Sequence, residues 1–190
     1  MENILWKVLL GGKPAGRNIE QHDITFAVGK QIDDCVPALK EFWPIPGVHV
    51  DSYVPVRIVG SYRVHVVAQD ESVPGAIPGA KLFFLNLGGY LPNDPEEYHE
   101  RMLVVADTME QAKELAKQNT FFTSRLGVPD TGDPHIDNRF EVDDIVAVND
   151  LIPGCKIVLT EVDAHFMAPE PVINGCFPLD ATDPFKRGEG

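Results

Sequence analysis

The sequence predicts an α+β fold made of two tandem β-β-α-β-β repeats, with mainly antiparallel sheets and approximate internal two-fold symmetry. Three observations lead to this prediction. A short apolar run that ends in Gly-Gly occurs twice, the same polar residues follow both runs in the same order, and each copy continues into a stretch with helical periodicity. Self-similarity at a fixed offset is the usual sign of a repeated structural unit.

The repeat becomes visible when the chain is shifted by 77 residues, which places residues 10–12 (Leu-Gly-Gly) on residues 87–89. After the predicted helix the offset becomes 86, because the second copy carries nine extra residues between positions 124 and 134. Four pairs of polar residues correspond in this alignment: Glu20 with Glu97, His22 with His99, His49 with His135, and Asp51 with Asp137.

Each element is predicted from its local pattern. Short apolar or alternating runs rich in β-branched and aromatic residues indicate strands, and apolar residues three and four apart indicate helices. These patterns predict strands at 4–10, 23–28, 49–59 and 62–68 with a helix at 32–42, and in the second copy strands at 81–87, 101–106, 140–148 and 155–162 with a helix at 109–116. Thr108 and Gln111 are the predicted N-cap pair of the second helix.

The boundaries of the units follow from turn-forming residues. Residues 1–69 are the first repeat unit and residues 80–162 the second. Between them, residues 70–79 contain two Pro-Gly steps, which predict a linker. Residues 163–190 are rich in Pro, Gly and Asp, so we expect an irregular C-terminal tail packed over the surface.

Composition excludes several classes of function. The net charge of -13 repels phosphate backbones and anionic lipids, so neither nucleic acid nor a membrane is an expected partner. No apolar run is long enough to span a bilayer. Three cysteines without CxxC spacing indicate a reduced, cytoplasmic location and no disulfide framework or zinc knuckle. Because small tandem domains often pair, a homodimer is the expected oligomer.

A resemblance to a known family rests on the run GGKPAGRNIEQHDITFAVG at residues 11–29, the FWP that ends the following helix, and HVDSY at residues 49–53. The chain resembles the bacterial family known as domain of unknown function fifteen forty-three, whose members carry one or two copies of the unit. The resemblance implies a cytoplasmic bacterial protein with no established activity. The second copy departs from the pattern: Asn18-Ile19-Glu20 becomes Pro95-Glu96-Glu97, and Trp43 is replaced by Thr120.

The repeated polar residues are the candidate site. Residues two apart on a strand point to the same face, so each unit would offer two imidazoles and two carboxylates on one face. These donors suit zinc, manganese or iron(II), with His22 and His49 as metal ligands and a divalent metal as the cofactor. They equally suit a histidine-carboxylate general base or a structural hydrogen-bond network. The candidate residues are Glu20, His22, His49, Asp51, Glu97, His99, His135 and Asp137.

The Gly-Gly pairs at 11–12 and 88–89 have two interpretations. A phosphate-binding loop is one, but GGKPAGR lacks both the GK[ST] ending of a P-loop and the GxGxxG spacing of a dinucleotide fold. The other is that the glycines supply positive φ angles in a turn after the strand, which is the interpretation we prefer.

Two functions remain open at this stage, and whether the protein is an enzyme is not decided by the sequence. The first is a non-catalytic binding or scaffold module built by internal duplication. The alternative is a metal-assisted hydrolase acting on a small molecule, with His22 and His49 as ligands and Glu20 or Asp51 as ligand or base. The sequence does not identify the small-molecule ligand.

Overall fold

A computed structural model describes residues 2–90, 95–118, 140–162 and 170–185. The fold is α+β with mostly antiparallel sheets and few helices, as predicted. The chain forms two compact units. Unit 1 contains residues 1–77 and 151–190, and unit 2 contains residues 78–150.

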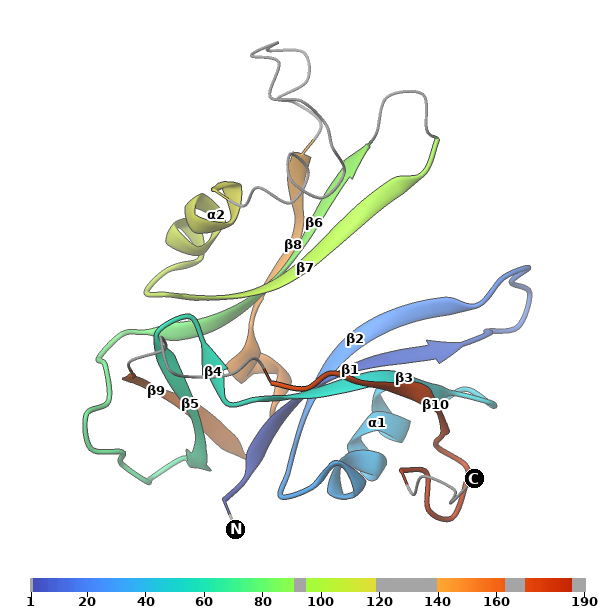
Figure 1. Cartoon of the computed structure of the whole chain (residues 1–190), viewed down its shortest axis with the longest axis horizontal. Coiled ribbons are helices and arrows are strands. Elements are labelled where there is room, and N and C mark those ends of the chain that lie inside the picture. The colour runs from blue at the N-terminus through green and yellow to red at the C-terminus, as the bar shows by residue number, and fades with distance from the viewer. Residues whose placement is uncertain (1, 91–94, 119–139, 163–169, 186–190) are drawn as a thin grey trace. The chain divides into compact units, whose positions relative to one another are not determined.

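The main sheet of unit 1 has four antiparallel strands in the order β10-β3-β1-β2 (Figure 1). Alternate residues of the central strand point into the core, where Val8 and Leu10 are fully buried. The strands are β1 (Ile4–Gly12), β2 (Gln21–Gly29), β3 (His49–Val56) and β10 (Ile173–Pro178).

One face of this sheet is covered by two short helical segments, a 3-10 helix η1 (Ile32–Cys35) and α1 (Val36–Phe42). The Asp34 carboxylate starts this region by accepting hydrogen bonds from the backbone N–H groups of Lys30 and Gln31. Leu39 and Cys35 pack into the core, each 1% exposed. The predicted continuous helix at 32–42 therefore has a 3-10 first turn.

A second sheet of unit 1 has the order β4-β5-β9, with β4 (Ile58–Val59), β5 (Tyr62–Ala68) and β9 (Cys155–Glu161). The predicted boundaries of the second repeat placed β9 with residues 80–162, and this was wrong. β9 pairs with β5 along its whole length, because Leu159 and Val64 both bury their side chains there. The end of the predicted linker joins the same sheet, since the backbone N–H of Ile77 donates to the Leu159 carbonyl.

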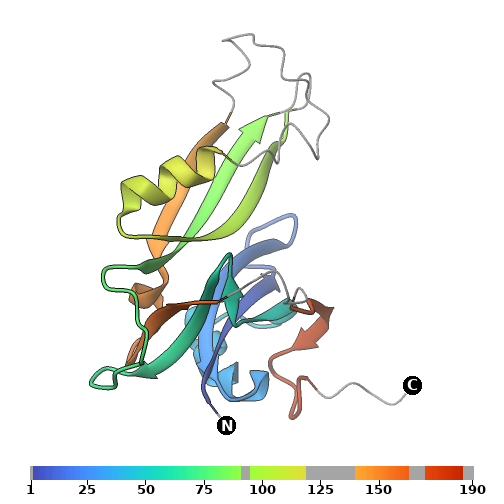
Figure 2. The ribbon, with the colours of Figure 1, turned by 60° about the vertical axis from the view of Figure 1, so that its left-hand side comes forward.

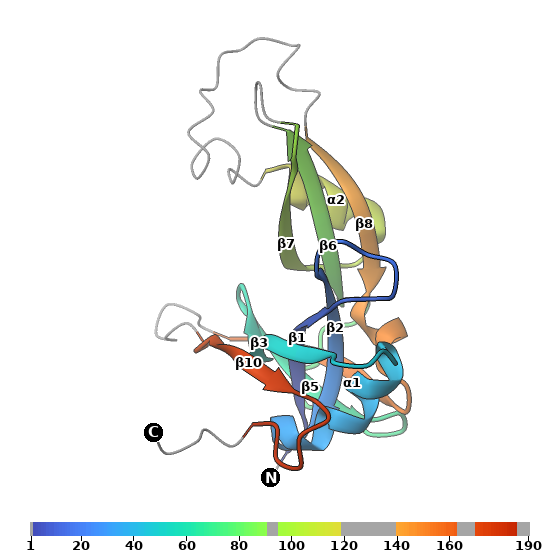
Figure 3. The ribbon, with the colours of Figure 1, turned by 90° about the vertical axis from the view of Figure 1, so that its right-hand side faces the viewer.

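The C-terminal segment was predicted to be an irregular tail, and this is also incorrect. Residues 173–178 form β10, which pairs with β3 (Figure 3). Phe177, Leu179 and Phe185 belong to the core of unit 1, and both phenylalanine rings contact the ring of Tyr53. The Pro- and Gly-rich composition of this segment indicates irregular structure, but the burial of these three apolar side chains holds the segment against the sheet.

Unit 2 is a three-stranded antiparallel sheet in the order β7-β6-β8, and α2 lies along one of its faces (Figure 2). The elements are β6 (Lys81–Tyr90), β7 (Glu97–Ala106), α2 (Met109–Lys117), β8 (Phe140–Ala147) and the 3-10 segment η3 (Val148–Leu151) at the boundary with unit 1. The predicted capping box of α2 is confirmed: Thr108 accepts from the Gln111 N–H, and the Gln111 side chain accepts from the Thr108 N–H. Ala112 and Ala116 face the core.

Among the helices in the described part of the chain, none is both long and apolar enough to cross a membrane.

Candidate metal centre

The first four predicted site residues come together in unit 1, on the face of the sheet opposite α1. Gly11 lies in the central strand with His22 directly opposite on β2 and His49 directly opposite on β3. Directly paired residues of antiparallel strands point to the same face, so both imidazoles lie above Gly11. Glu20 stands two residues before His22 and joins them. Leu10, the neighbour of Gly11, points the other way into the core.

Asp51 lies on the same face as His49, at a β-bulge of β3. Leu10 pairs with Val50 and Leu9 pairs with Ser52, so Asp51 is the extra residue on β3. A bulge changes the direction of the side chain it carries, and bulges are frequent beside functional sites. Val50 keeps its place in the core, fully buried, while Asp51 turns toward the imidazoles.

The donor atoms of these four side chains are close together. Nε2 of His22 lies 3.2 Å from Glu20 Oε1 and 3.1 Å from Asp51 Oδ2. Nε2 of His49 lies 3.5 Å from Glu20 Oε1 and 3.1 Å from Asp51 Oδ1. In a tetrahedral zinc site with bonds of 2.0–2.2 Å, neighbouring ligand atoms are roughly 3.3–3.6 Å apart. The His49–Glu20 separation falls in this range and the other three are slightly shorter. Glu20, His49 and Asp51 can each place one donor atom within 4.8 Å of the others, and His22 lies beside both carboxylates.

One carboxylate oxygen of the cluster lacks a hydrogen bond. Oδ2 of Asp51 is buried and accepts no hydrogen bond from any residue that the structure describes, although Nε2 of His22 lies 3.1 Å away. A cation held between the donors would satisfy this oxygen.

A backbone carbonyl fixes the ring orientation of His49. Its Nδ1 lies 3.1 Å from the carbonyl oxygen of Gly47, which can only accept, so Nδ1 carries a proton. In the neutral ring Nε2 then has a lone pair, and this lone pair faces the carboxylates of Glu20 and Asp51. Metal-binding histidines commonly donate their other ring N–H to a backbone carbonyl in this way.

Gly11 leaves room for the cluster. A Cβ atom at this position would lie 2.6 Å from Asp51 Oδ2, 2.7 Å from His49 Nε2 and 3.0 Å from Glu20 Oε1. The predicted role of the Gly-Gly pair in a turn with positive φ is wrong, since Gly11 and Gly12 are inside β1 and neither has a positive φ angle. Glycine is needed at Gly11 because the donor atoms occupy the place of a side chain.

The site is closed on one side and open on the other. The side chains of His49 and Asp51 are 14% and 25% exposed, whereas those of His22 and Glu20 are 44% and 43% exposed. An ion held by all four would therefore have a side accessible to water or to a ligand.

Unit 2 brings a similar group together, but not with all the predicted residues. Glu97 and His99 meet Asp143, whose Oδ2 lies 3.4 Å from His99 Nε2. The predicted partners His135 and Asp137 lie outside the described residues. The strand register contradicts the predicted correspondence of His49 with His135. Gly11 pairs with His49 on β3, whereas the equivalent Gly88 pairs with Glu141 on β8.

A sequence signal for Asp143 was available but was overlooked. Val50-Asp51-Ser52-Tyr53-Val54 and Val142-Asp143-Asp144-Ile145-Val146 share V-D-x-x-V with an apolar fourth residue, at an offset of 92 residues. Identity at His135 and Asp137 favoured the shorter offset of 86. The strand pairing selects the longer one, because Val142 takes the position of buried Val50 next to the central strand.

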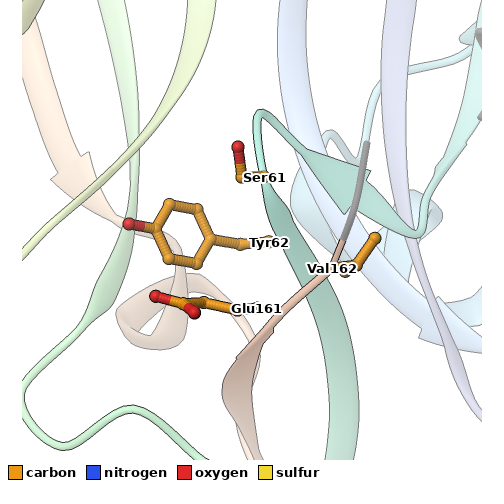
Figure 4. Close-up of a pocket in the computed structure, with 4 residues that line it drawn as sticks. All are labelled: Ser61, Tyr62, Glu161 and Val162. Atoms are coloured by element: carbon orange, nitrogen blue, oxygen red, sulfur yellow. The ribbon is translucent and has the colours of Figure 1, made fainter. Parts of the chain in front are cut away.

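Other reactive groups lie elsewhere. Burial, with Asp34 and Asp33 nearby, raises the pKa of the Cys35 thiol to about 12. An open depression is lined by Ser61, Tyr62, Glu161 and Val162, where the ring of Tyr62 and the carboxylate of its strand partner Glu161 lie side by side (Figure 4). None of the candidate donors lines this depression.

Comparison with known proteins finds a matching family model and a similar solved structure. Residues 17–66, which carry Glu20, His22, His49 and Asp51, match the family model Domain of Unknown Function (DUF1543), so the resemblance read from the sequence is confirmed there. The chain is similar to the crystal structure of a protein Il1583 from Idiomarina loihiensis, with 27% sequence identity, a TM-score of 0.65, and coverage of 94% of this chain and 98% of that chain. No curated protein matches the chain.

Proposed function

We propose that this protein is a metal-binding module whose unit 1 holds one divalent transition-metal ion through Glu20, His22, His49 and Asp51. The observation that carries this proposal is that each of two imidazole nitrogens lies 3.1–3.5 Å from both carboxylates, above a glycine. Imidazole and carboxylate donors suit zinc, iron(II) and manganese, and the short separations favour a small ion such as zinc.

Charge supports a cation over a purely structural network. With neutral imidazoles the cluster carries two negative charges in a chain of net charge -13, and a divalent ion would neutralise them. A structural network would instead leave Asp51 Oδ2 buried without a donor, which costs about 1–3 kcal/mol. An ion removes this penalty because it satisfies the oxygen directly.

Internal duplication is the origin we propose for the two units. Both place a helix between the second and third strand of an antiparallel sheet, in the orders β3-β1-β2 and β8-β6-β7. Both also carry a bulged aspartate on the third strand, Asp51 and Asp143. Duplication of this kind enlarges a binding surface without requiring catalysis, which is why a non-catalytic module is the first choice.

Metal-assisted hydrolysis of a small molecule is the second candidate, and the open side of the site favours it. A catalytic metal needs a coordination position for water or substrate, and the exposed side chains of Glu20 and His22 leave the cluster accessible. A bound divalent ion would make its water ligand more acidic and polarise a substrate oxygen. In this alternative His22, His49 and Asp51 would hold the ion, and Glu20 on the open side would accept a proton from the bound water.

Metal content of the purified chain tests the proposal. We expect elemental mass spectrometry to find one equivalent of a transition metal per chain. Both His22→Ala and His49→Ala should lose this metal and keep the circular dichroism spectrum of the wild type. His65→Ala is the matched control, because His65 lies on β5 and bonds to Thr160, away from the cluster. A metal-free chain that also fails to take up added zinc would overturn the proposal.

The same metal-loaded protein separates the two functions. Hydrolysis of activated phosphate and carboxylate esters that disappears in Glu20→Gln, with the metal retained, would support the hydrolase. Metal binding without turnover on these substrates supports the module.

A further inference from the structure

We infer that unit 2 carries a second cation site, formed by Glu97, His99 and Asp143, which takes an oxygen-preferring divalent ion such as Mn²⁺. It binds this ion more weakly than unit 1 binds its own. The inference rests on the proposed function in one respect, since the geometry of unit 1 is the template for this site. It concerns a different set of residues and a different class of ion.

The three donors converge in the same way as those of unit 1. Each can offer a ligand atom, and these atoms lie within 4.8 Å of one another. Nε2 of His99 lies 3.4 Å from Asp143 Oδ2 and 3.8 Å from Glu97 Oε2. Both are longer than the corresponding separations of His22 in unit 1, 3.1 Å to Asp51 and 3.2 Å to Glu20, as a larger ion with longer bonds requires.

A glycine again makes room for the donors. A Cβ atom on Gly88 would lie 2.8 Å from Glu97 Oε1 and would also collide with Asp143 Oδ2. Gly88 lies inside β6 and has no positive φ angle, so backbone conformation does not explain the glycine. The space above it is taken by carboxylate oxygens.

The bulge on β8 has the same position as the bulge on β3. Leu87 pairs with Val142 and Asn86 with Asp144, which leaves Asp143 as the extra residue. A register change of this kind interrupts the strand pairing and is kept where a side chain must be directed. Here it directs a carboxylate toward His99, as the bulge in unit 1 directs one toward His22.

The donor chemistry differs between the two units. His49 has no imidazole counterpart among the described residues, since the backbone of Glu141 occupies its register position. The Asn86 side chain adds a buried oxygen, Oδ1, that accepts no hydrogen bond from any described residue and lies on the same face of β6 as Gly88. One nitrogen among several oxygens suits manganese or calcium better than zinc.

The donor set explains the weaker binding. Unit 2 offers one imidazole, that of His99, beside two carboxylates, whereas unit 1 offers the imidazoles of both His22 and His49. None of the donors in unit 2 is as buried as His49, whose side chain is 14% exposed.

Manganese titration of a chain with unit 1 disabled tests the inference. In the double variant His22→Ala/His49→Ala, electron paramagnetic resonance of free Mn²⁺ should report one bound ion per chain. Asp143→Asn in this background should weaken binding by at least about tenfold, since loss of even an outer-shell partner weakens metal sites 10–100-fold. Asp107→Asn is the control: Asp107 is exposed, follows the end of β7 and is not one of the donors, so binding should change less than about twofold.

A measurement without substitution keeps the test independent of folding. Mn²⁺ added to the wild-type chain should broaden the imidazole resonances of His99 and leave those of His65 unchanged. Equal effects of Asp143→Asn and Asp107→Asn, or no bound ion in the double variant, would overturn the inference. If the wild-type chain binds one metal that the double variant loses completely, the proposed function stands and this inference fails. If the only metal bound is one that Asp143→Asn weakens and that His22→Ala/His49→Ala leaves in place, this inference stands and the proposed function fails.

Discussion

A methyl group on Gly11 would lie 2.6 Å from Oδ2 of Asp51, closer than two nonbonded atoms can approach. We therefore expect Gly11→Ala to push Asp51, His49 and Glu20 apart and to weaken zinc binding by at least about tenfold. Alanine suits a strand at least as well as glycine, so the sheet itself should form. Titration calorimetry with zinc, together with circular dichroism, measures both effects.

Gly88→Ala is the control for that substitution. It introduces the same methyl group at the corresponding position of unit 2, so zinc binding in unit 1 should be unchanged. Wild-type affinity in Gly11→Ala would show that the donors above Gly11 do not hold the ion.

Zinc should raise the melting temperature of the wild-type chain. A ligand that binds only the folded state adds about 2.7 kcal/mol at a free concentration 100 times its Kd, which is worth roughly 5–10 °C for a chain of this size. His49→Ala should lose the shift because it removes the ligand that Gly47 orients. Differential scanning fluorimetry with and without zinc measures it, and equal shifts in the two proteins would argue against the site.

The cysteines should differ in their reaction with a maleimide at neutral pH. Cys176 is exposed and should react first. Burial raises the pKa of Cys155, which is half-buried, so it should react more slowly. Cys35 is 1% exposed and should be labelled only after denaturation. Mass spectrometry of peptides after timed labelling gives the order, and rapid modification of Cys35 in the native chain would contradict the buried position.

Alkaline pH should destabilise the chain partly through Cys35. The thiol has an ordinary pKa near 9.0 and a folded pKa of about 12, so between these values the folded state holds a proton that the unfolded state has lost. Stability therefore falls as pH rises through this window, by at most about 1.4 kcal/mol per pH unit from this group. Urea unfolding of wild type and Cys35→Ala at several pH values isolates the contribution of Cys35 to the free energy of unfolding, because other groups titrate equally in both proteins. Parallel curves would show that Cys35 contributes nothing.

The C-terminal segment should contribute to the stability of unit 1. Phe177→Ala removes a ring that contacts Tyr53 and Phe185 in the core, which should cost about 3–5 kcal/mol. Val172→Ala is the control, since Val172 is 58% exposed and its change should cost less than about 0.5 kcal/mol. Urea denaturation compares them, and a small effect of Phe177→Ala would mean that β10 does not support the core.

Local patterns in the sequence determined much of this protein. Alternating apolar residues predicted the strands, and the Thr108 and Gln111 pair predicted the start of α2. Strand periodicity also placed Glu20 with His22, and His49 with Asp51, on common faces. These properties depend on residues that are neighbours along the chain, so their chemistry alone specifies them.

The tertiary structure decided the rest, because it depends on which apolar surfaces meet. Burial of Leu159 beside Val64 paired β9 with β5 across the boundary predicted between the repeats. Burial of Phe177 made a strand of a segment whose composition indicates irregular structure. The pairing of Val142 with Leu87 created the bulge that selects Asp143 as the carboxylate of unit 2. A bulge is a property of two paired strands, and spacing along one strand cannot specify it.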